Sequence, residues 1–218
     1  MRKRKLSQKY IIGIDEVGRG SLAGPVMVAA LAMPMNLKLK IKSANWRIKL
    51  KLRDSKKLSL KQREEWFKFI KQQKIYFVVA SVSPKIIDKI NVSQAANLAA
   101  TKALQRLIKN YELRIKNCAI YLDGGLYIKS KIKNQKSKLQ FKNLKTKTII
   151  RGDEKIPAIS LASIVAKVHR DKLMKRLHKK YPRYNFINNV GYGTKKHIKA
   201  LRKFGHSLIH RKTFHCVI

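Results

Sequence analysis

Short apolar runs, separated by glycine-rich or lysine-rich segments, set the pattern of this chain. Four of these runs are rich in β-branched residues and have the length of buried strands: 10–14, 26–31, 75–82 and 118–122. A turn that contains several glycines separates the first two runs. The pattern therefore predicts at least four strands.

Helical periodicity marks the stretches between and after these strands. Ser59, with Gln62 three residues later, forms a capping box and predicts the start of a helix. Small and apolar residues recur at helical spacing over 94–108, and the longest predicted helix covers 159–180. Because strands alternate with helices after an initial run of strands, the order favours an α/β domain with a mixed sheet.

Two lysine-rich stretches interrupt this alternation. Over 36–53, leucine and isoleucine alternate with lysine, which suits an exposed hairpin and equally suits a basic insert without fixed structure. The stretch 129–147 shows little pattern. No internal repeat or linker divides the sequence, so we expect one domain over 1–218, with a helical C-terminal region from about residue 181.

Composition adds a strong positive charge. The 218 residues include 52 lysines and arginines but only 11 aspartates and glutamates, which gives a formal net charge of +41. Such a surface attracts polyanions, of which nucleic acid is the first candidate and an anionic membrane surface the second. The hydrophobic content of 44% is enough for a folded core.

Neither secretion nor membrane insertion is favoured by the sequence. It has no apolar run of the roughly 18 residues needed to cross a bilayer. The basic N-terminus is like the start of a signal peptide, but Asp15 and Glu16 interrupt the apolar stretch that follows. The two cysteines, Cys118 and Cys216, cannot build a disulfide framework. We therefore expect a cytoplasmic protein.

The eleven acids are scarce enough for their positions to be informative. Asp15 and Glu16 directly follow the first strand, and Asp123 directly follows the strand over 118–122. Asp171 lies inside the long predicted helix. Grouped carboxylates need a cation to offset their repulsion, and carboxylate oxygens are natural ligands of Mg²⁺. Two such ions about 3.5–4 Å apart can support phosphodiester hydrolysis, so a metal-dependent nuclease is one hypothesis.

Each acid also has a simpler interpretation. Asp15 and Glu16 suit an ordinary turn after a strand. Asp123 with Gly124 is a common turn dipeptide, and Asp171 can pair with a neighbouring basic residue. Adjacent residues of a strand point to opposite faces. Asp15 and Glu16 can therefore share a site only if the chain bends there, which the glycines that follow would permit.

The motifs around these acids resemble those of a known family, ribonuclease HII. The opening motif is DEVGRG at 15–20, followed by LAGPV at 22–26. Five further blocks match the family in order: DSKKLS at 54–59, LDG at 122–124, RGD with IPAI, ASIVAKV and RD within 151–171, GYGTK and a histidine within 191–197, and IHR with a phenylalanine within 209–214. A lone Asp-Glu pair carries little information, but six ordered blocks over most of the chain are specific.

The resemblance implies a ribonuclease H-like fold, in which helices flank a central mixed sheet and a helical C-terminal region follows. It implies cleavage of the RNA strand in RNA–DNA hybrids, and on the 5′ side of single ribonucleotides embedded in duplex DNA. The ends produced would be 3′-hydroxyl and 5′-phosphate. The implied catalytic and metal-binding residues are Asp15, Glu16, Asp123 and Asp171. They would hold two ions of Mg²⁺ or Mn²⁺ bridged by Asp15, and the division of the other three acids is left open.

The resemblance also implies a substrate-binding set. Gly18, Arg19 and Gly20 would read the ribose, because glycines let the backbone approach the sugar and bond its 2′-hydroxyl. Arg19 in place of lysine favours ribonuclease HII over ribonuclease HIII. Tyr192 would pack on the sugar beside the cleaved bond. The lysines implied to hold phosphates are Lys56, Lys57, Lys167 and Lys195.

These residues have ordinary alternatives too. The glycine loop alone suits a tight turn, Tyr192 suits a core tyrosine, and each lysine suits a solvated charge. The remaining candidates for chemistry are histidines that are not spaced as a zinc site. We interpret them as packing or phosphate-contacting residues: His169, His197, His206 and His210.

Three rival functions fit parts of the sequence. A non-catalytic nucleic-acid-binding protein would need neither a divalent ion nor a carboxylate cluster. Another nuclease of the same fold, such as ribonuclease HIII or a resolvase, would differ in its substrate. A membrane-surface role would need a basic amphipathic helix, and the lysine-rich stretches lack that period. We expect a monomer, and the sequence does not decide whether it contacts a replication clamp.

Overall fold

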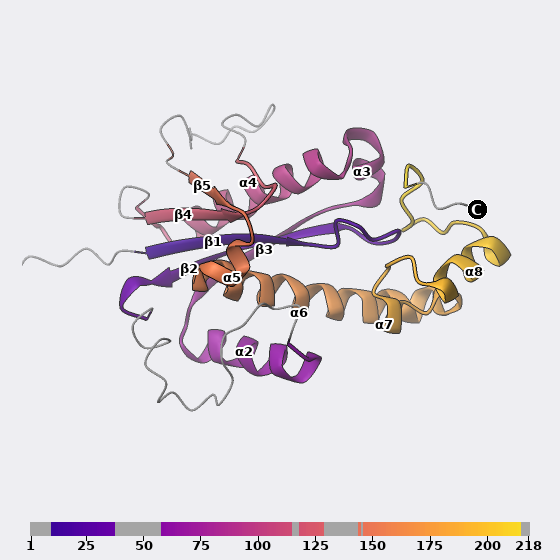
Figure 1. Cartoon of the computed structure of the whole chain (residues 1–218), viewed down its shortest axis with the longest axis horizontal. Coiled ribbons are helices and arrows are strands. Elements are labelled where there is room, and N and C mark those ends of the chain that lie inside the picture. Colours follow the sequence, from indigo (N-terminus) through magenta and orange to yellow (C-terminus); the bar gives the residue numbers. More distant parts are fainter. Residues whose placement is uncertain (1–9, 38–57, 115–117, 129–143, 145, 215–218) are drawn as a thin grey trace, which may run out of the picture.

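One mixed sheet forms the centre of the structure, a computed structural model that describes residues 10–37, 58–114, 118–128, 144 and 146–214 (Figure 1). The strand order is β3-β2-β1-β4-β5. The bounds are β1 Tyr10–Val17, β2 Val26–Pro34, β3 Tyr76–Val82, β4 Cys118–Asp123 and β5 Thr146–Ile149. β2 is antiparallel to both β1 and β3, whereas β1, β4 and β5 run parallel to one another. The predicted mixed sheet is therefore confirmed.

The edge strand β5 is the one element of the sheet that the sequence does not predict. Its residues are TKTI, and the first two are exposed. A short, polar edge strand lacks the apolar run by which the other four strands are recognised. β5 begins inside the lysine-rich stretch 129–147. Most of that stretch and of 36–53 lies outside the described residues, as do Lys56 and Lys57.

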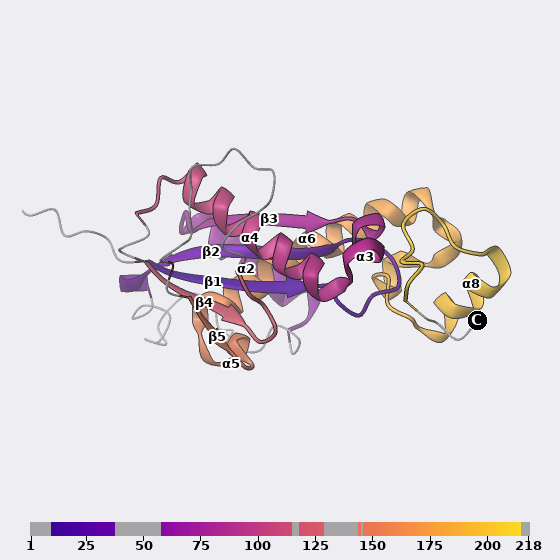
Figure 2. The same ribbon diagram turned by 90° about the horizontal axis from the view of Figure 1, so that it is seen from above.

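Helices cover both faces of the sheet (Figures 1 and 2). One face carries α3 and α4, and the other carries α2 and α6, with bounds Pro84–Ile90, Val92–Asn110, Leu60–Gln72 and Pro157–Lys180. Because strand side chains alternate, Ile12 and Ile14 of β1 enter the core beneath α4, while Ile11 enters the core shared with α2 and α6. Apolar residues on both faces therefore bury β1 and β2 almost completely.

The long helix α6 lies directly against β1. Its first half carries small buried residues, including Ala158, Ala162 and Ala166, which allow a close approach to the sheet. At the closest point, a Cβ on Gly13 would overlap with the backbone of Ala158. Among the described residues, no helix combines the length and the apolar composition that a membrane crossing requires.

A helical C-terminal region extends from the far end of α6, as predicted (Figure 2). It consists of the 3-10 helix η2 Pro182–Tyr184, the short helix α7 Phe186–Asn189 and the helix α8 Lys195–Phe204. This region has its own small core, in which Phe186 and Leu201 pack with Ala23 from the loop between β1 and β2. The C-terminal region is thus joined to the glycine-rich loop that follows β1.

Two buried arginines strengthen this junction, and neither forms an ion pair with an acid in the part of the chain that the structure describes. Arg170 of α6 donates to the carbonyls of Pro25 (2.6 Å), Ala23 (3.1 Å) and Val190 (3.0 Å). Arg211 donates to the carbonyls of Gly18 (2.6 Å), Arg19 (2.8 Å) and Gly24 (3.0 Å). Burial lowers the pKa of both guanidinium groups, that of Arg211 to about 9, a value at which it stays protonated at neutral pH. The two arginines therefore fix the backbone of the loop from residue 18 to residue 25.

We expect Gly13→Ala to destabilise the protein by about 1–3 kcal/mol, because the added methyl group would push α6 away from β1. The measurement is the free energy of unfolding in a chemical denaturant. Gly20→Ala is the matched control, since a Cβ at Gly20 meets no atom within 4 Å. Equal stability of Gly13→Ala and the native protein would contradict the close contact between β1 and α6.

Candidate active site

Three acids converge at the carboxyl ends of two neighbouring parallel strands. Ile14 of β1 pairs with Leu122 of β4, so the next residues, Asp15 and Asp123, lie at the same level of the sheet. One carboxylate oxygen from each of Asp15, Glu16 and Asp123 lies within 4.8 Å of the other two. Such a group of oxygens is suited to holding a divalent cation.

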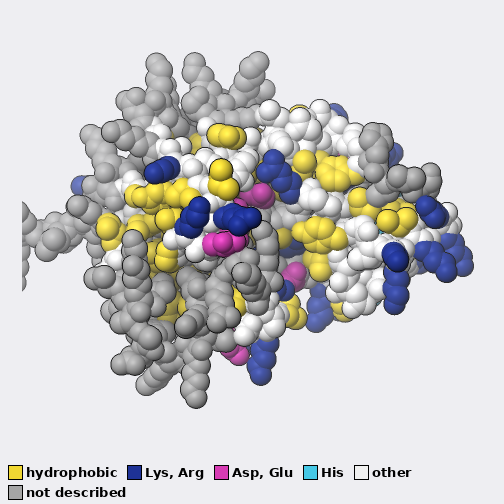
Figure 3. All heavy atoms as spheres, viewed as in Figure 1, with side chains coloured by type: hydrophobic (Ala, Val, Ile, Leu, Met, Phe, Trp, Pro, Cys, Tyr) yellow, Lys and Arg dark blue, Asp and Glu magenta, His cyan; other side chains and the backbone are white. Residues whose placement is uncertain are grey.

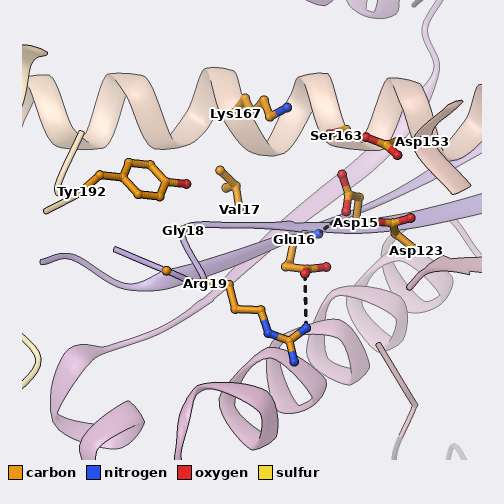
Figure 4. A pocket seen from close by; sticks show the side chains of 11 residues that line it. Asp15, Glu16, Val17, Gly18, Arg19, Asp123, Asp153, Ser163, Lys167 and Tyr192 are labelled. Atoms are coloured by element: carbon orange, nitrogen blue, oxygen red, sulfur yellow. Dashed lines mark hydrogen bonds and ion pairs between the residues drawn. The ribbon is translucent and has the colours of Figure 1, made fainter. Parts of the chain in front are cut away.

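The way in which Asp15 and Glu16 share this site differs from the prediction. No bend separates them, because β1 continues to Val17 and both acids keep their pairing with β2. Their side chains leave opposite sides of the strand (Figure 4). The pairing of β1 with β4 ends at Ile14, so β1 has an open edge beside the acids. Carboxylates from both faces can meet around that edge.

A cavity of about 160 Å³ opens beside the acids. Its lining residues are Asp15, Glu16, Val17, Gly18, Arg19, Gly20, Asp123, Asp153, Ser163, Lys167 and Tyr192. They come from β1 and the loop after it, from β4, from the short helix α5 Gly152–Lys155, from α6 and from the C-terminal region. The cavity thus lies where the sheet, α6 and the C-terminal region meet.

Backbone contacts fix Asp123 and its surroundings. The Asp123 Oδ1 atom accepts a hydrogen bond from the Gly152 N–H at 2.7 Å. A Cβ at position 152 would lie 2.6 Å from Ile159 Cδ1, so glycine permits the close packing of α5 on α6. On the opposite wall of the cavity, the Ser163 hydroxyl of α6 bonds the carboxyl group of Asp15. The acids are therefore held from several sides before any ligand binds.

The electrostatics of the cavity disfavour a full set of ionised carboxylates. Asp15 is only 4% exposed, and burial, followed by the charge of Glu16, raises its pKa well above the usual range. Asp123 and Asp153 raise it further, while the Ser163 hydrogen bond lowers it. Burial also raises the pKa of Glu16, which the nearby charge of Arg19 partly offsets. The negative charges thus repel one another in a poorly solvated space.

Arg19 compensates this charge only weakly. Its Nη1 atom lies 3.5 Å from Glu16 Oε1, and its Nη2 atom donates to the Ser93 hydroxyl at 2.8 Å. The second carboxylate oxygen of Glu16, Oε2, is buried and has no hydrogen-bond partner among the described residues. On the face shown in Figure 3, most acidic side chains in view lie near the middle, with basic side chains around them.

Most of the predicted site residues that the structure describes line the cavity. Asp15, Glu16 and Asp123 do so, and the substrate-binding candidates that join them are Gly18, Arg19, Gly20, Lys167 and Tyr192. Tyr192 is 42% exposed, and its hydroxyl points toward the acids (Figure 4). Lys195, at the exposed first turn of α8, is not among the lining residues.

Asp171 does not join the acid cluster. Its Oδ2 atom accepts a hydrogen bond from Arg63 Nη2 of α2 at 3.2 Å. The cause is helical geometry, because eight residues separate Asp171 from Ser163 on α6. That distance along the helix is about 12 Å, and the direction turns by about 80°. The placement of Asp171 in the site, which follows from the motif resemblance, is not supported by this arrangement.

Asp153 is the lining acid that the sequence-based selection leaves out. It is 5% exposed, lies in α5 and acts electrostatically on Asp15. The acids selected from the sequence included those that directly follow predicted strands, and the strand before Asp153 is the unpredicted β5. Two signals in the sequence point to Asp153: acidic residues are scarce in this chain, and Asp153 lies in the RGD block at 151–153.

Comparison with known proteins shows which family has this sequence. The family model for ribonuclease HII matches residues 12–217. Ribonuclease HII of Pelagibacter ubique is 41% identical over 207 residues, which cover 94% of this chain and 96% of that protein. Ribonuclease HII of Clostridium beijerinckii is 40% identical over 208 residues, which cover 95% of this chain and 68% of that protein.

Solved structures share the fold. Ribonuclease HII in the PCNA:RNase HII complex from Archaeoglobus fulgidus has 26% identity and a TM-score of 0.67, with 95% of this chain and 96% of that chain covered. Bst-RNase HIII in complex with Mn²⁺ has a TM-score of 0.65 at 18% identity, with 92% of this chain and 64% of that chain covered, so it shows likeness of fold alone. With a family model that spans nearly all of its residues and full-length relatives at about two-fifths identity, this chain belongs to the ribonuclease HII family.

Proposed function

We propose that this protein cuts the RNA strand of RNA–DNA hybrids, and also cuts duplex DNA on the 5′ side of a single embedded ribonucleotide. As a ribonuclease HII, it is an endonuclease that leaves 5′-phosphate ends. The observation that carries the proposal is the meeting of Asp15, Glu16 and Asp123 in one cavity with the Gly18–Gly20 loop. That cavity places cation ligands beside a backbone able to approach a sugar.

The acids fit a divalent cation in three respects. Their oxygens come within 4.8 Å of one another, Glu16 Oε2 is buried with no hydrogen-bond partner among the described residues, and burial raises the pKa of Asp15. A bound cation would offset the repulsion and give Glu16 Oε2 a partner. We propose Mg²⁺ or Mn²⁺, because both take carboxylate oxygens as ligands.

Ions held by Asp15, Glu16 and Asp123 would supply the activation of water and the stabilisation of the leaving oxygen that phosphodiester hydrolysis needs. The chain itself provides the ligands, the orientation of the substrate and part of the charge. Ser163 and the Gly152 N–H hold Asp15 and Asp123 in place. Lys167, one turn of α6 beyond Ser163, lines the cavity and can attract a phosphate oxygen. These contacts fix the position of the substrate without reading its base sequence.

Ribose selection follows from the loop after β1. The carbonyls of Gly18 and Arg19 accept hydrogen bonds from Arg211, and Gly18 has a φ of 83°. A Cβ at Gly18 would overlap with the Arg170 guanidinium, so this position requires glycine. The rigid loop lets the backbone approach a 2′-hydroxyl closely, and Tyr192 faces it across the cavity. We propose that both groups contact the sugar beside the cleaved bond.

We further propose that Asp153, in place of Asp171, completes the set of four acids. Asp153 lines the cavity and acts on the charge of Asp15. Asp171 instead contacts Arg63, and its side chain is 24% exposed. An ion pair of this kind contributes about 0–1 kcal/mol to stability.

The central prediction concerns three labelled duplexes: DNA with one ribonucleotide, DNA alone, and an RNA–DNA hybrid. With Mg²⁺ or Mn²⁺, we expect cutting of the hybrid, cutting on the 5′ side of the single ribonucleotide, and no cutting of DNA. Gel analysis of the products measures this, with EDTA and the Asp15→Asn variant as controls. Binding without cutting in either metal would indicate the non-catalytic nucleic-acid-binding protein instead.

The fourth acid is tested by a matched pair of variants, Asp153→Asn and Asp171→Asn. We expect Asp153→Asn to reduce the cleavage rate at least about 10-fold, the usual effect of disturbing a metal site. Asp171→Asn should stay within about twofold of the native rate, because it loses only a partly exposed ion pair. The reverse ranking of the two rates would restore Asp171 to the site.

Stability in the absence of metal provides a test that does not depend on activity. The raised pKa of Asp15 means that the folded state binds this proton more tightly than the unfolded chain does. The stability of the metal-free protein should therefore fall as the pH rises from about 4 toward 7. Asp15→Asn removes the buried charge, so in EDTA at pH 7 it should be more stable than the native protein.

Thermal unfolding with EDTA and with Mn²⁺ measures these effects. Mn²⁺ should stabilise the native protein and leave Asp15→Asn nearly unchanged, because the variant lacks one ligand. Lower stability of Asp15→Asn in EDTA would show that the carboxylate is not repelled by its neighbours.

A further inference from the structure

Two buried histidines of the C-terminal region lie in direct contact. His197 of α8 is 0% exposed and His210 is 3% exposed. Their Nε2 atoms are 3.0 Å apart. The other ring nitrogens also have partners: His197 Nδ1 lies 2.8 Å from the Tyr192 carbonyl oxygen, and His210 Nδ1 lies 2.9 Å from the Ser207 nitrogen. The four residues thus form an unbroken line of hydrogen bonds.

The direction of these bonds follows from the two ends of the line. The Ser207 backbone N–H can only donate, so His210 Nδ1 accepts from it and carries no proton, and the Ser207 hydroxyl, 2.8 Å from the same nitrogen, then donates to it as well. A neutral His210 then carries its proton on Nε2 and donates it to His197 Nε2. His197 in turn carries its proton on Nδ1, which donates to the Tyr192 carbonyl, a group that can only accept. Each ring therefore has one defined tautomer.

The surroundings of the histidine pair favour the neutral rings. Tyr184 and Phe186 pack on the pair, with ring centroids 4.7 Å from His210 and 5.3 Å from His197 respectively. Burial lowers the pKa of His197, and burial together with the charges of His197 and His206 lowers the pKa of His210 to about 4. A proton added to either ring would place two N–H groups against each other, or an N–H against Ser207.

The charged groups on the outer side of His210 would not stabilise a protonated His210 ring. The cavity of about 640 Å³ on that side is lined, besides Tyr181 and His206, by Lys85, Lys89, Lys212 and Asp88. Asp88 already accepts hydrogen bonds from the Lys212 N–H and from the N–H and hydroxyl of Thr213. The neighbouring lysines repel a charged imidazole, so the pair stays neutral at physiological pH.

We propose that His197 and His210 are positioning residues that fix Tyr192 at the edge of the active-site cavity. This inference rests on the proposed function, in which Tyr192 contacts the ribose. The Tyr192 carbonyl is held by His197, and its N–H donates to the Asn189 carbonyl at 2.8 Å. The preceding carbonyl, of Gly191, accepts from Leu22 and Ala23 in the loop after β1. The histidine line thereby connects the backbone of Tyr192 to the C-terminal segment at Ser207.

The tautomers provide a test that is independent of activity. Protonated and unprotonated imidazole nitrogens have distinct ¹⁵N resonances, so NMR of the full-length, ¹⁵N-histidine-labelled protein at pH 7 can assign both rings. We expect His197 to be protonated on Nδ1 only and His210 on Nε2 only. Protonation of His197 on Nε2, or a positively charged ring at pH 7, would overturn the proposal.

The functional test uses His210→Leu, which removes the line, and His210→Gln, whose amide can still donate to His197. With the single-ribonucleotide duplex and Mn²⁺, we expect His210→Leu to lose about 10- to 100-fold in kcat/KM, the effect of a misplaced contact residue. His210→Gln should recover part of this loss. Tyr184→Phe is the matched control, because it loses a hydrogen bond to Gly205 in the same cluster and leaves the line intact; it should keep the native rate.

A double-variant cycle with Tyr192→Ala separates positioning from general damage. If His210 acts through Tyr192, His210→Leu should cause no further loss of kcat/KM when Tyr192 is already alanine. Fully additive losses, or an unaffected His210→Leu, would overturn the proposal while leaving the nuclease function in place. If the native protein itself cuts no ribonucleotide-containing duplex, the proposed function fails and the NMR result alone decides the histidine line.

Discussion

Two guanidinium groups bonded to backbone carbonyls hold the loop after β1 against α6 and the C-terminal region. Arg170 and Arg211 are completely or almost completely buried, and neither makes an ion pair with an acid among the described residues. Hydrogen bonds to six different carbonyl groups compensate their burial, and those carbonyls lie in the loop after β1 and at Val190. A carbonyl oriented toward an arginine cannot turn away, so the loop keeps one conformation. This constraint makes a loop of several glycines rigid.

The acid cluster has the opposite character, because its members destabilise one another. Parallel pairing of β1 with β4 sets Asp15 beside Asp123, and the open edge of β1 lets Glu16 join them. The apolar cores, one on each face of the sheet, provide the stability that offsets this repulsion. In a chain with a net charge of +41, the acids also form a local negative site within a positive surface. A polyanionic duplex is attracted by the surface, while the recessed carboxylates favour a divalent cation.

The sequence predicts the parts of this site that depend on local pattern. Apolar runs reveal β1, β2, β3 and β4, and with them the positions of Asp15, Glu16 and Asp123 at strand ends. The sequence does not predict β5, because an exposed edge strand needs no apolar run. Asp153 is therefore not recognised as an acid that follows a strand. Asp171 shows the converse difficulty, since a motif block does not reveal that helical turns separate it from the acid cluster of the described structure. Arg170 and Arg211 lie in two of the motif blocks, but the sequence does not reveal their role, because arginine is ordinarily exposed and its backbone carbonyl partners have no sequence pattern.

The acid cluster and the residues proposed to contact the ribose are therefore held by different parts of the fold. The acids are anchored in the sheet, between cores built by α4 on one face and by α2 and α6 on the other. Leu22 and Ala23, in the second half of the glycine loop, belong to the small C-terminal core. Hydrogen bonds to Asn189 and His197 hold the backbone of Tyr192 in the same region. Helix α6 contributes to both, with Ser163 and Lys167 beside the acids and Arg170 beside the loop, one turn beyond Lys167 and two turns beyond Ser163. Because the rise per residue of a helix is fixed, α6 sets the distance between the acid cluster and the loop after β1.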